Sequence, residues 1–213
     1  MINFHGLRVL VLAPHTDDAE LGMGGTIAKM KREGAHVSVV AFSAAEESLP
    51  EGFEEGITRK EFSDSMRLYQ VDEFRVLDFK VRNFPRDRQS ILDELIRLRS
   101  QLKPDIIFCP SHQDVHQDHH TIHIEALRAF KTRTILCYEL PWNCFQLQAD
   151  LFLELTESDF NLKCDSINLY KSQLAKQSMY FQPSILRAHV EQNAARLGRI
   201  GLYEAFKVMR VIN

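Results

Sequence analysis

The sequence of 213 residues has no long apolar run, no closely paired cysteines and no strong excess of charge of one sign. No apolar run approaches the ~20 residues that a membrane-spanning helix needs, and the first residues lack the basic and apolar regions of a signal peptide. We therefore expect a cytoplasmic protein without a membrane span. The net charge of −3 gives no reason to expect nucleic acid or an anionic membrane surface as a partner.

The cysteines are few and well separated, at positions Cys109, Cys137, Cys144 and Cys164. They form no C-x-x-C pair and are too sparse for a disulfide framework, so we expect them to be reduced. Cys109 and Cys137 lie inside strand-like runs. A small buried residue is the expected role there, with a thiolate ligand or nucleophile as the alternative.

Composition and patterning indicate one α/β domain spanning residues 1–213. A hydrophobic content of 45% and a charged content of 26% are ordinary for a soluble globular protein, and the length suits one core. Short apolar runs alternate with amphipathic stretches of helical period, which predicts a mostly parallel sheet with helices on both faces. The run from Leu7 to Ala13 is continuously apolar, as expected for a strand buried on both sides.

The same pattern places the individual elements. Strands are predicted at residues 7–13, 37–42, 74–77, 106–109, 135–139, 151–155 and 205–212. Helices are predicted at residues 18–32, 59–69, 87–102, 121–130, 164–173 and 185–197. The acidic segment 44–56 contains Pro50 and two glycines, so we expect it to form a long loop.

Two clusters contain side chains that commonly bind metals. Five of the nine histidines fall between His112 and His123, where uniform scatter would put roughly half of one. A second cluster, from His15 to Glu20, directly follows the first predicted strand. Both clusters follow predicted strands, and open parallel sheets bind ligands beyond the carboxyl ends of their strands. Two imidazoles and one carboxylate meeting there would form the open three-ligand site of a catalytic zinc enzyme.

Parts of the first cluster have simpler explanations. Asp17-x-x-Glu20 ahead of an apolar helix resembles a capping box, but capping requires no histidine at the end of a buried strand. Gly22-Met-Gly24-Gly25 suggests a dinucleotide-binding loop, which fails on spacing because these glycines lie about one turn inside the predicted helix. Close packing of that helix on the sheet explains the glycines better.

The second cluster has more histidines than one ion can use. If a helix begins near Gln117, then His116, His119, His120 and His123 share roughly one face. His119 and His120 are adjacent and point about 100° apart, so at most one of the two is a ligand. Whether His120 or His123 contributes to the site stays open.

Each cluster contains a sequence motif, Pro14-His-Thr-Asp-Asp-Ala-Glu-Leu-Gly22-Met-Gly-Gly25 and Asp114-Val-His-Gln-Asp-His119. These resemble the motifs P-H-x-D-D-x-E-L-G-x-G-G and D-x-H-x-D-H of the PIG-L/LmbE-like family of zinc-dependent N-deacetylases. The resemblance extends to Tyr203-Glu-Ala-Phe206 and implies a Rossmann-like α/β fold. It also implies a substrate that is an N-acetylated amino sugar or a conjugate of one.

The resemblance implies three zinc ligands, namely His15, Asp18 and His119. This mixed nitrogen and oxygen set also suits Fe²⁺ or another divalent metal. Asp17 would act as general base on the attacking water, whose pKa bound zinc lowers to ~7. A cationic His116 would stabilise the oxyanion or protonate the leaving amine, with Asp118 as its orienting partner.

The sequence departs from the family pattern at three places, one of which is the segment that often contacts substrate. Thr16 stands where proline is frequent, Val115 stands where arginine is common, and the loop 44–56 lacks an Arg-Gly segment. These changes leave the proposed metal ligands and the general base in place, but they leave the identity of the sugar open.

Tyr138-Glu-Leu-Pro-Trp-Asn143 resembles a branch of the family associated with surface-polysaccharide and sugar-modification pathways. Trp142 offers a flat apolar face for stacking on a sugar ring, and Glu139 and Asn143 could bind its hydroxyls. Alternatively, Trp142 anchors the core or a subunit interface in a homo-oligomer.

Three other functions use similar residues. Fe(II) oxygenases use the same two-histidine, one-carboxylate triad but are usually built on all-β barrels. The dipeptide Asp118-His119 hints at a metal phosphohydrolase, normally all-helical. The predicted alternation of strands and helices argues against both. A non-catalytic sugar-binding protein with a structural metal is the third, although an open site with a spare base has little structural purpose.

Overall fold

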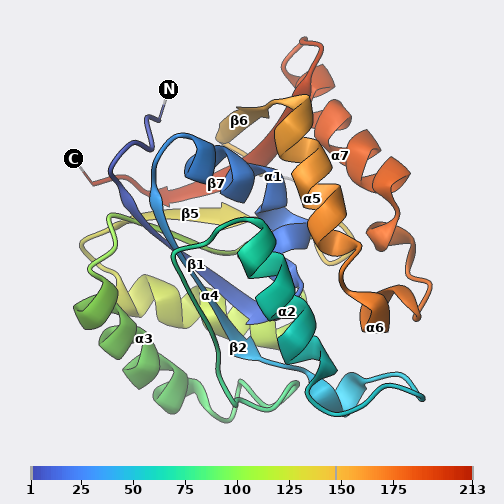
Figure 1. Ribbon diagram of the computed structural model, residues 1–213. Coiled ribbons are helices and arrows are strands. Elements are labelled where there is room, and N and C mark those ends of the chain that lie inside the picture. Colours follow the sequence, from blue (N-terminus) through green and yellow to red (C-terminus); the bar gives the residue numbers. More distant parts are fainter. Residues whose placement is uncertain (1, 147, 213) are drawn as a thin grey trace.

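The computed structural model describes residues 2–146 and 148–212. Its described part contains one seven-stranded sheet of order β3-β2-β1-β4-β5-β7-β6 (Figure 1). The strands are β1 Arg8–His15, β2 His36–Ser43, β3 Glu73–Val76, β4 Ile106–Pro110, β5 Thr134–Tyr138, β6 Leu151–Leu155 and β7 Leu202–Arg210. The first five run parallel, whereas β7 is antiparallel to both β5 and β6. The prediction of a mostly parallel α/β sheet is confirmed.

Helices cover both faces of the sheet, as expected. They are α1 Asp18–Arg32, α2 Ile57–Leu68, α3 Arg88–Leu102, α4 Gln117–Ala129, α5 Glu157–Ile167, α6 Lys171–Leu174 and α7 Pro183–Arg196. Short 3₁₀ helices lie at Glu46–Ser48 and Met179–Phe181. α3 and α4 bury apolar side chains against one face, while α1, α2, α5 and α7 cover the other (Figure 1).

β1 lies at the centre of the sheet and contributes to both cores. Val9, Val11 and Ala13 pack into the core beneath α1, whereas Leu10 and Leu12 pack into the core beneath α3 and α4. Alternate side chains of a strand point to opposite faces, so a strand covered on both sides must be apolar throughout. The unbroken apolar run in the sequence therefore predicted this position correctly.

α1 is bent within its second turn, where Met23 has a non-helical backbone (φ −150°, ψ 25°). The bend exposes backbone N–H groups, and the buried Glu204 carboxylate of β7 accepts hydrogen bonds from Gly25 (3.1 Å) and Thr26 (2.6 Å). Lys163 of α5 balances this carboxylate, with its Nζ 2.7 Å from Glu204 Oε1. The two ends of the chain are thus joined by a buried polar contact.

The glycines of α1 allow this helix to approach its neighbours closely. A Cβ on Gly22 would lie 2.3 Å from the Tyr138 ring, and one on Gly25 would lie 2.4 Å from Leu155. Real Cβ atoms do not make such contacts without displacing their neighbours. Close packing therefore accounts for this segment, as the sequence suggested.

The C-terminal half departs from the predicted helix boundaries. The sequence predicted one helix over residues 164–173, whereas the structure has α5 at Glu157–Ile167 and the separate short α6 at Lys171–Leu174. Thr156 starts α5 with a capping box, in which its hydroxyl and the Asp159 carboxylate each accept the other residue's backbone N–H. This cap fixes a start seven residues earlier than the apolar pattern indicated.

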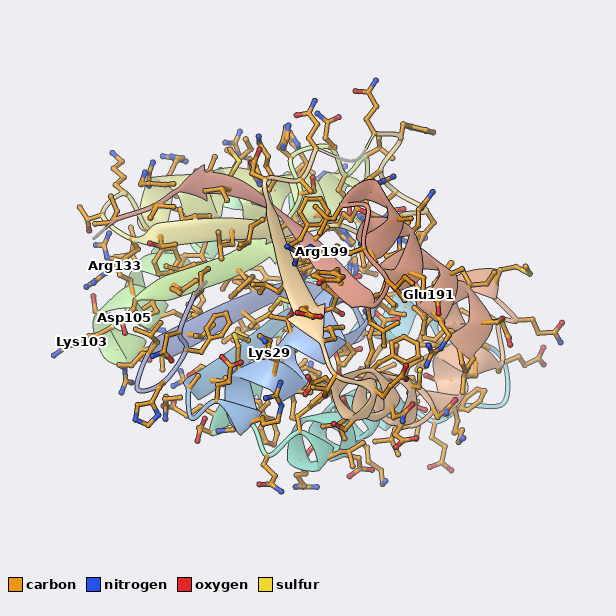
Figure 2. All side chains as sticks on the ribbon, turned by 90° about the horizontal axis from the view of Figure 1, so that it is seen from above. Lys29, Lys103, Asp105, Arg133, Glu191 and Arg199 are labelled. Carbon is orange, nitrogen blue, oxygen red and sulfur yellow. The ribbon has the colours of Figure 1, made fainter. Side chains whose placement is uncertain are left out.

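The order of the sheet reverses between β1 and β4, so the loops after these strands open a crevice at their carboxyl ends. His15 ends β1, and the loop after β4 leads into α4. Figure 2 shows Lys103, Asp105 and Arg133 at the opposite edge, where β4 and β5 begin. A membrane-crossing helix is not found among the described residues, because none of their helices combines sufficient length with sufficient apolar character.

Candidate metal centre

Three ligand-type atoms from the two clusters converge at the carboxyl end of β1. Asp18 Oδ2 lies 3.1 Å from His15 Nδ1 and 3.3 Å from His119 Nε2. The two imidazole nitrogens are themselves 3.3 Å apart. A tetrahedral ion bound at ~2.0–2.1 Å separates its ligand atoms by roughly 3.3 Å. The three side chains predicted as ligands are therefore spaced to hold one ion.

Each imidazole of this triad contacts a carboxylate through its other ring nitrogen. Asp118 Oδ2 lies 3.1 Å from His15 Nε2, and Asp114 Oδ2 lies 2.7 Å from His119 Nδ1. Metal-binding histidines commonly donate their second N–H to a carboxylate, which fixes the tautomer and leaves the other nitrogen free for the ion. Both carboxylates are buried. The geometry thus directs a lone pair of each ring toward the same point.

Asp118 has a different partner from the one that the sequence suggested. Its carboxylate was expected to orient His116, but it contacts His15 and accepts a 2.6 Å hydrogen bond from the backbone N–H of Arg82. Asp114, to which no such role was assigned, is the partner of His119. The signal for Asp114 is its place at the start of the D-x-H-x-D-H motif, in the loop that leads into α4.

His116 lies beside the triad as the N-cap residue of α4. Its Nδ1 accepts the backbone N–H of Asp118 at 3.2 Å, so the neutral ring carries its proton on Nε2. Ring centroids lie 4.6 Å from His119 and 5.1 Å from His15. Burial and these neighbouring imidazoles lower the pKa of His116. The surroundings therefore favour a neutral Nε2–H donor over the cation expected from the sequence.

Asp17 precedes α1 and lines the same cavity as the triad. Its side chain makes no capping hydrogen bond, so the capping box suggested by the sequence is not formed. Burial and the neighbouring charge of Asp18 raise the pKa of Asp17 to about 6. A carboxylate with such a pKa can accept a proton near neutral pH.

Glu20 does not cap the helix; its side chain helps to hold the turn that carries Asp17. It is fully buried, and its Oε1 lies 2.5 Å from the hydroxyls of both Ser65 and Tyr170. Tyr170 also lies 2.5 Å from the carbonyl oxygen of Thr16. These contacts tie the backbone just before Asp17 to α2 and to the segment before α6. Neither Ser65 nor Tyr170 was identified from the sequence, because both are distant from the motifs.

The triad, Asp17 and His116 open onto a cavity of about 250 Å³. Trp142 and Tyr180 form one wall, stacked with ring centroids 4.0 Å apart and planes inclined by 15°. One face of Trp142 is therefore already covered. Further polar lining comes from Asn143, Gln173 and Lys176.

Glu139 lies outside the residues that line this cavity, unlike its predicted neighbours Trp142 and Asn143. Its carboxylate lies 3.3 Å from His189 Nε2 on α7. Burial raises the pKa of Glu139 to about 7 and lowers that of His189 to about 4. The contact joins the β5 loop to α7, away from the metal centre.

The remaining histidines of the cluster do not join the triad. His120 is exposed and lines a separate depression between α3 and α4. His123 is buried, with Nδ1 2.9 Å from the carbonyl oxygen of Pro110 and 3.6 Å from Cys137 Sγ. Cys109 Sγ lies 3.5 Å from Cys137 Sγ in the same core, and both thiols are free.

The model of the family described as "PIG-L: GlcNAc-PI de-N-acetylase" matches residues 10–130, which include both motifs. The chain belongs to this family. A relative in Escherichia coli K12, the uncharacterized deacetylase YaiS, is 24% identical over 173 residues, covering 77% of this chain and 90% of the relative. The resemblance inferred from the motifs is confirmed.

Solved structures share the fold. The N,N'-diacetylchitobiose deacetylase of Pyrococcus horikoshii is similar with a TM-score of 0.80 and 23% identity, over 94% of this chain and 83% of that one. The conserved protein TT1542 of Thermus thermophilus gives a TM-score of 0.77 and 22% identity, over 97% and 96% of the two chains. The 4-carboxy-2-hydroxymuconate hydratase GalB of Pseudomonas putida KT2440 gives 0.78 and 19%, over 96% and 98%. The fold is thus used for more than one reaction.

Proposed function

We propose that this protein is a zinc-dependent amide hydrolase that removes the acetyl group from an N-acetylated amino sugar or its conjugate. The observation that carries the proposal is the convergence of His15 Nδ1, Asp18 Oδ2 and His119 Nε2 beside Asp17 in one cavity. Family membership supports the reaction, and so do the deacetylase names of its relatives.

His15, Asp18 and His119 would hold the ion, with Asp118 and Asp114 orienting the two imidazoles. Two nitrogens and one oxygen suit zinc, and Fe²⁺ is the alternative metal. When bound, the ion supplies a Lewis acid that activates water and polarises the amide carbonyl. The three ligands leave the cavity side of the site open to substrate.

Asp17 takes the proton of the attacking water and can return it to the amine that leaves. Burial and the charge of Asp18 raise its pKa to about 6, and a carboxyl that titrates near neutral pH is suited to both accepting and returning a proton. His116 donates its Nε2–H to the negative charge that develops on the amide oxygen. The neutral ring can make this hydrogen bond because its Nδ1 accepts the backbone N–H of Asp118, which leaves the proton on Nε2.

The cavity supports a sugar as the substrate. Its volume of about 250 Å³ suits one small polar ring, and its lining joins an aromatic wall to a few hydrogen-bonding groups, as sugar sites require. Trp142 and Asn143 would contact the ring, whereas Glu139 is not placed to do so. A pathway of surface-polysaccharide or sugar modification is consistent with the sequence resemblance.

Acetate release tests this function directly. The purified protein, reconstituted with zinc, is expected to release acetate from N-acetylglucosamine or one of its glycosides, and the His15→Ala variant is expected not to. Fe²⁺-specific activity would favour the other metal. Metal binding without hydrolysis of any N-acetyl sugar would favour a binding protein with a structural ion.

A further inference from the structure

One cation reaches the cavity from the segment at α6. Lys176 lines the cavity at its solvent-exposed side, and its Nζ donates to Gln173 Oε1 at 2.7 Å. Gln173, which also lines the cavity, donates from Nε2 to Ser172 Oγ at 3.2 Å. Ser172 in turn donates its hydroxyl (2.5 Å) and its backbone N–H (2.8 Å) to the carboxylate of Glu61. Glu61 and Ser172 are only 4% and 0% exposed.

This chain of hydrogen bonds gives the ammonium a defined place. Because the Ser172 hydroxyl donates to Glu61, it can only accept from Gln173, which turns the amide oxygen toward Lys176. A free lysine side chain samples many conformations, whereas this one is tethered to a buried carboxylate through two side chains. Gln173 accepts from one of the three ammonium N–H groups, which leaves two for other acceptors.

The charge of Lys176 has no paired anion. No carboxylate in the described part of the chain forms an ion pair with it, and Asp17 and Glu61 act on its charge only from a distance. Asp17 and Asp18, the carboxylates that line the cavity, are already assigned to the metal centre. A divalent ion held there would offset both. The cavity then presents one cation for which its own wall offers no counter-charge.

We propose that Lys176 binds an anionic substituent, a phosphate or a carboxylate, carried by the N-acetylated substrate, and so selects charged substrates over neutral ones. This inference rests on the proposed deacetylase function and names the substrate class of the same site. Both anions accept charge-assisted hydrogen bonds from an ammonium. The substituent would extend toward the open side of the cavity, while the acetamide lies at the triad.

Lys176 could instead act on Asp17, and the two roles have different kinetic signatures. A cation that tunes Asp17 changes kcat for every substrate and shifts the acid limb of the pH profile. A cation that binds a substituent changes KM, and only for substrates that carry the anion.

The test compares N-acetylglucosamine with N-acetylglucosamine 1-phosphate and with N-acetylmuramic acid, so that phosphate and carboxylate are examined separately. The wild type is expected to prefer at least one charged substrate. Lys176→Met is expected to lower the charged-to-neutral ratio of kcat/KM about tenfold, through KM. Lys176→Arg should keep most of the preference. Lys171→Met, which alters the lysine at the start of α6, five residues before Lys176 and outside the residues that line the cavity, is the matched control.

A binding measurement without turnover accompanies the kinetics. Calorimetric affinity for glucosamine 1-phosphate, a deacetylated product, should fall about tenfold in Lys176→Met and stay unchanged in Lys171→Met. A wild-type preference for the neutral sugar, an equal loss for all substrates, or a fall in kcat with a shifted pH profile would each overturn the inference. Absence of acetate release from every N-acetyl sugar would instead contradict the proposed function.

Discussion

His15 links the two clusters through both of its ring nitrogens. Nδ1 faces Asp18 and His119, and Nε2 contacts Asp118. One side chain thus joins the end of β1 to the first turn of α4, and its tautomer decides whether a lone pair points at the proposed ion. Metal binding at this site therefore depends on which ring nitrogen of His15 carries the proton.

Asp17→Asn is expected to retain the metal and to lower kcat by ~10²–10⁴, because the amide keeps the shape of the carboxylate and removes the base. In the wild type, protonation of Asp17 removes the base, so kcat/KM should fall as the pH is lowered through the pKa of about 6. A bound divalent cation lowers this pKa, which places the acid limb at or below that value. Near-normal turnover in the variant would assign the proton transfer to another group, with Glu20 as the neighbouring carboxyl.

His116→Ala is expected to leave metal content unchanged and to lower kcat by ~10²–10³, the usual cost of losing one donor to an oxyanion. Steady-state kinetics on zinc-loaded protein measures the effect. His116→Gln, which offers an N–H donor of similar reach, should lose less. An unchanged kcat in the alanine variant would reject the role of His116 altogether.

At the scale of elements, the entry to α4 positions the imidazoles that we propose as metal ligands. The backbone of Arg82 donates to Asp118, whose carboxylate orients His15, while Asp114 in the loop before α4 orients His119. The three segments that follow β1, β3 and β4 therefore meet at one pair of imidazoles.

Asp118→Asn should weaken zinc affinity ~10–100-fold, since an amide does not replace the charge that orients His15. Competition with a chromophoric chelator measures the affinity. Gln117→Ala, an exposed neighbour in the same turn, is the control and should bind zinc normally. If Asp118 serves His116 instead, as the sequence suggested, the variant would lose kcat and keep its zinc affinity.

The stacked pair of Trp142 and Tyr180 joins the β5 loop to the 3₁₀ helix Met179–Phe181. Because the two rings form one wall, Trp142→Ala and Tyr180→Ala should each raise KM for an amino-sugar substrate, with metal content and melting temperature unchanged. Paired kinetics and thermal unfolding separate binding from folding. A variant that unfolds or dissociates, with normal KM in the folded remainder, would make the wall structural.

At the scale of the whole molecule, the sequence predicted the parts that depend on local pattern. The apolar run of β1 and the position of His15 at its end follow from strand periodicity, and the reversal of strand order explains why the distant His119 meets it. The partner of Asp118 was not predictable, because its carboxylate contacts His15 and the backbone N–H of Arg82, both distant in the sequence, while only its own backbone N–H meets the nearby His116.

Other residues of the site could not be predicted from local sequence pattern either, because tertiary contacts determine where they lie. Tyr170 and Lys176 lie far along the chain from the first motif, and their proximity to it depends on how α5 and α6 pack. The bend of α1 depends on Glu204 in the last strand. Long-range polar contacts of this kind leave no periodic signal in a single sequence.

The central claim is that His15, Asp18 and His119 bind one catalytic ion, and metal stoichiometry tests it most directly. After zinc reconstitution and dialysis, elemental analysis should find about one ion per chain in the wild type and in Asp17→Asn, and almost none in His15→Ala, Asp18→Ala or His119→Ala. A wild-type protein that binds no divalent metal, or a His119→Ala variant that keeps its ion while His120→Ala or His123→Ala loses it, would contradict the account.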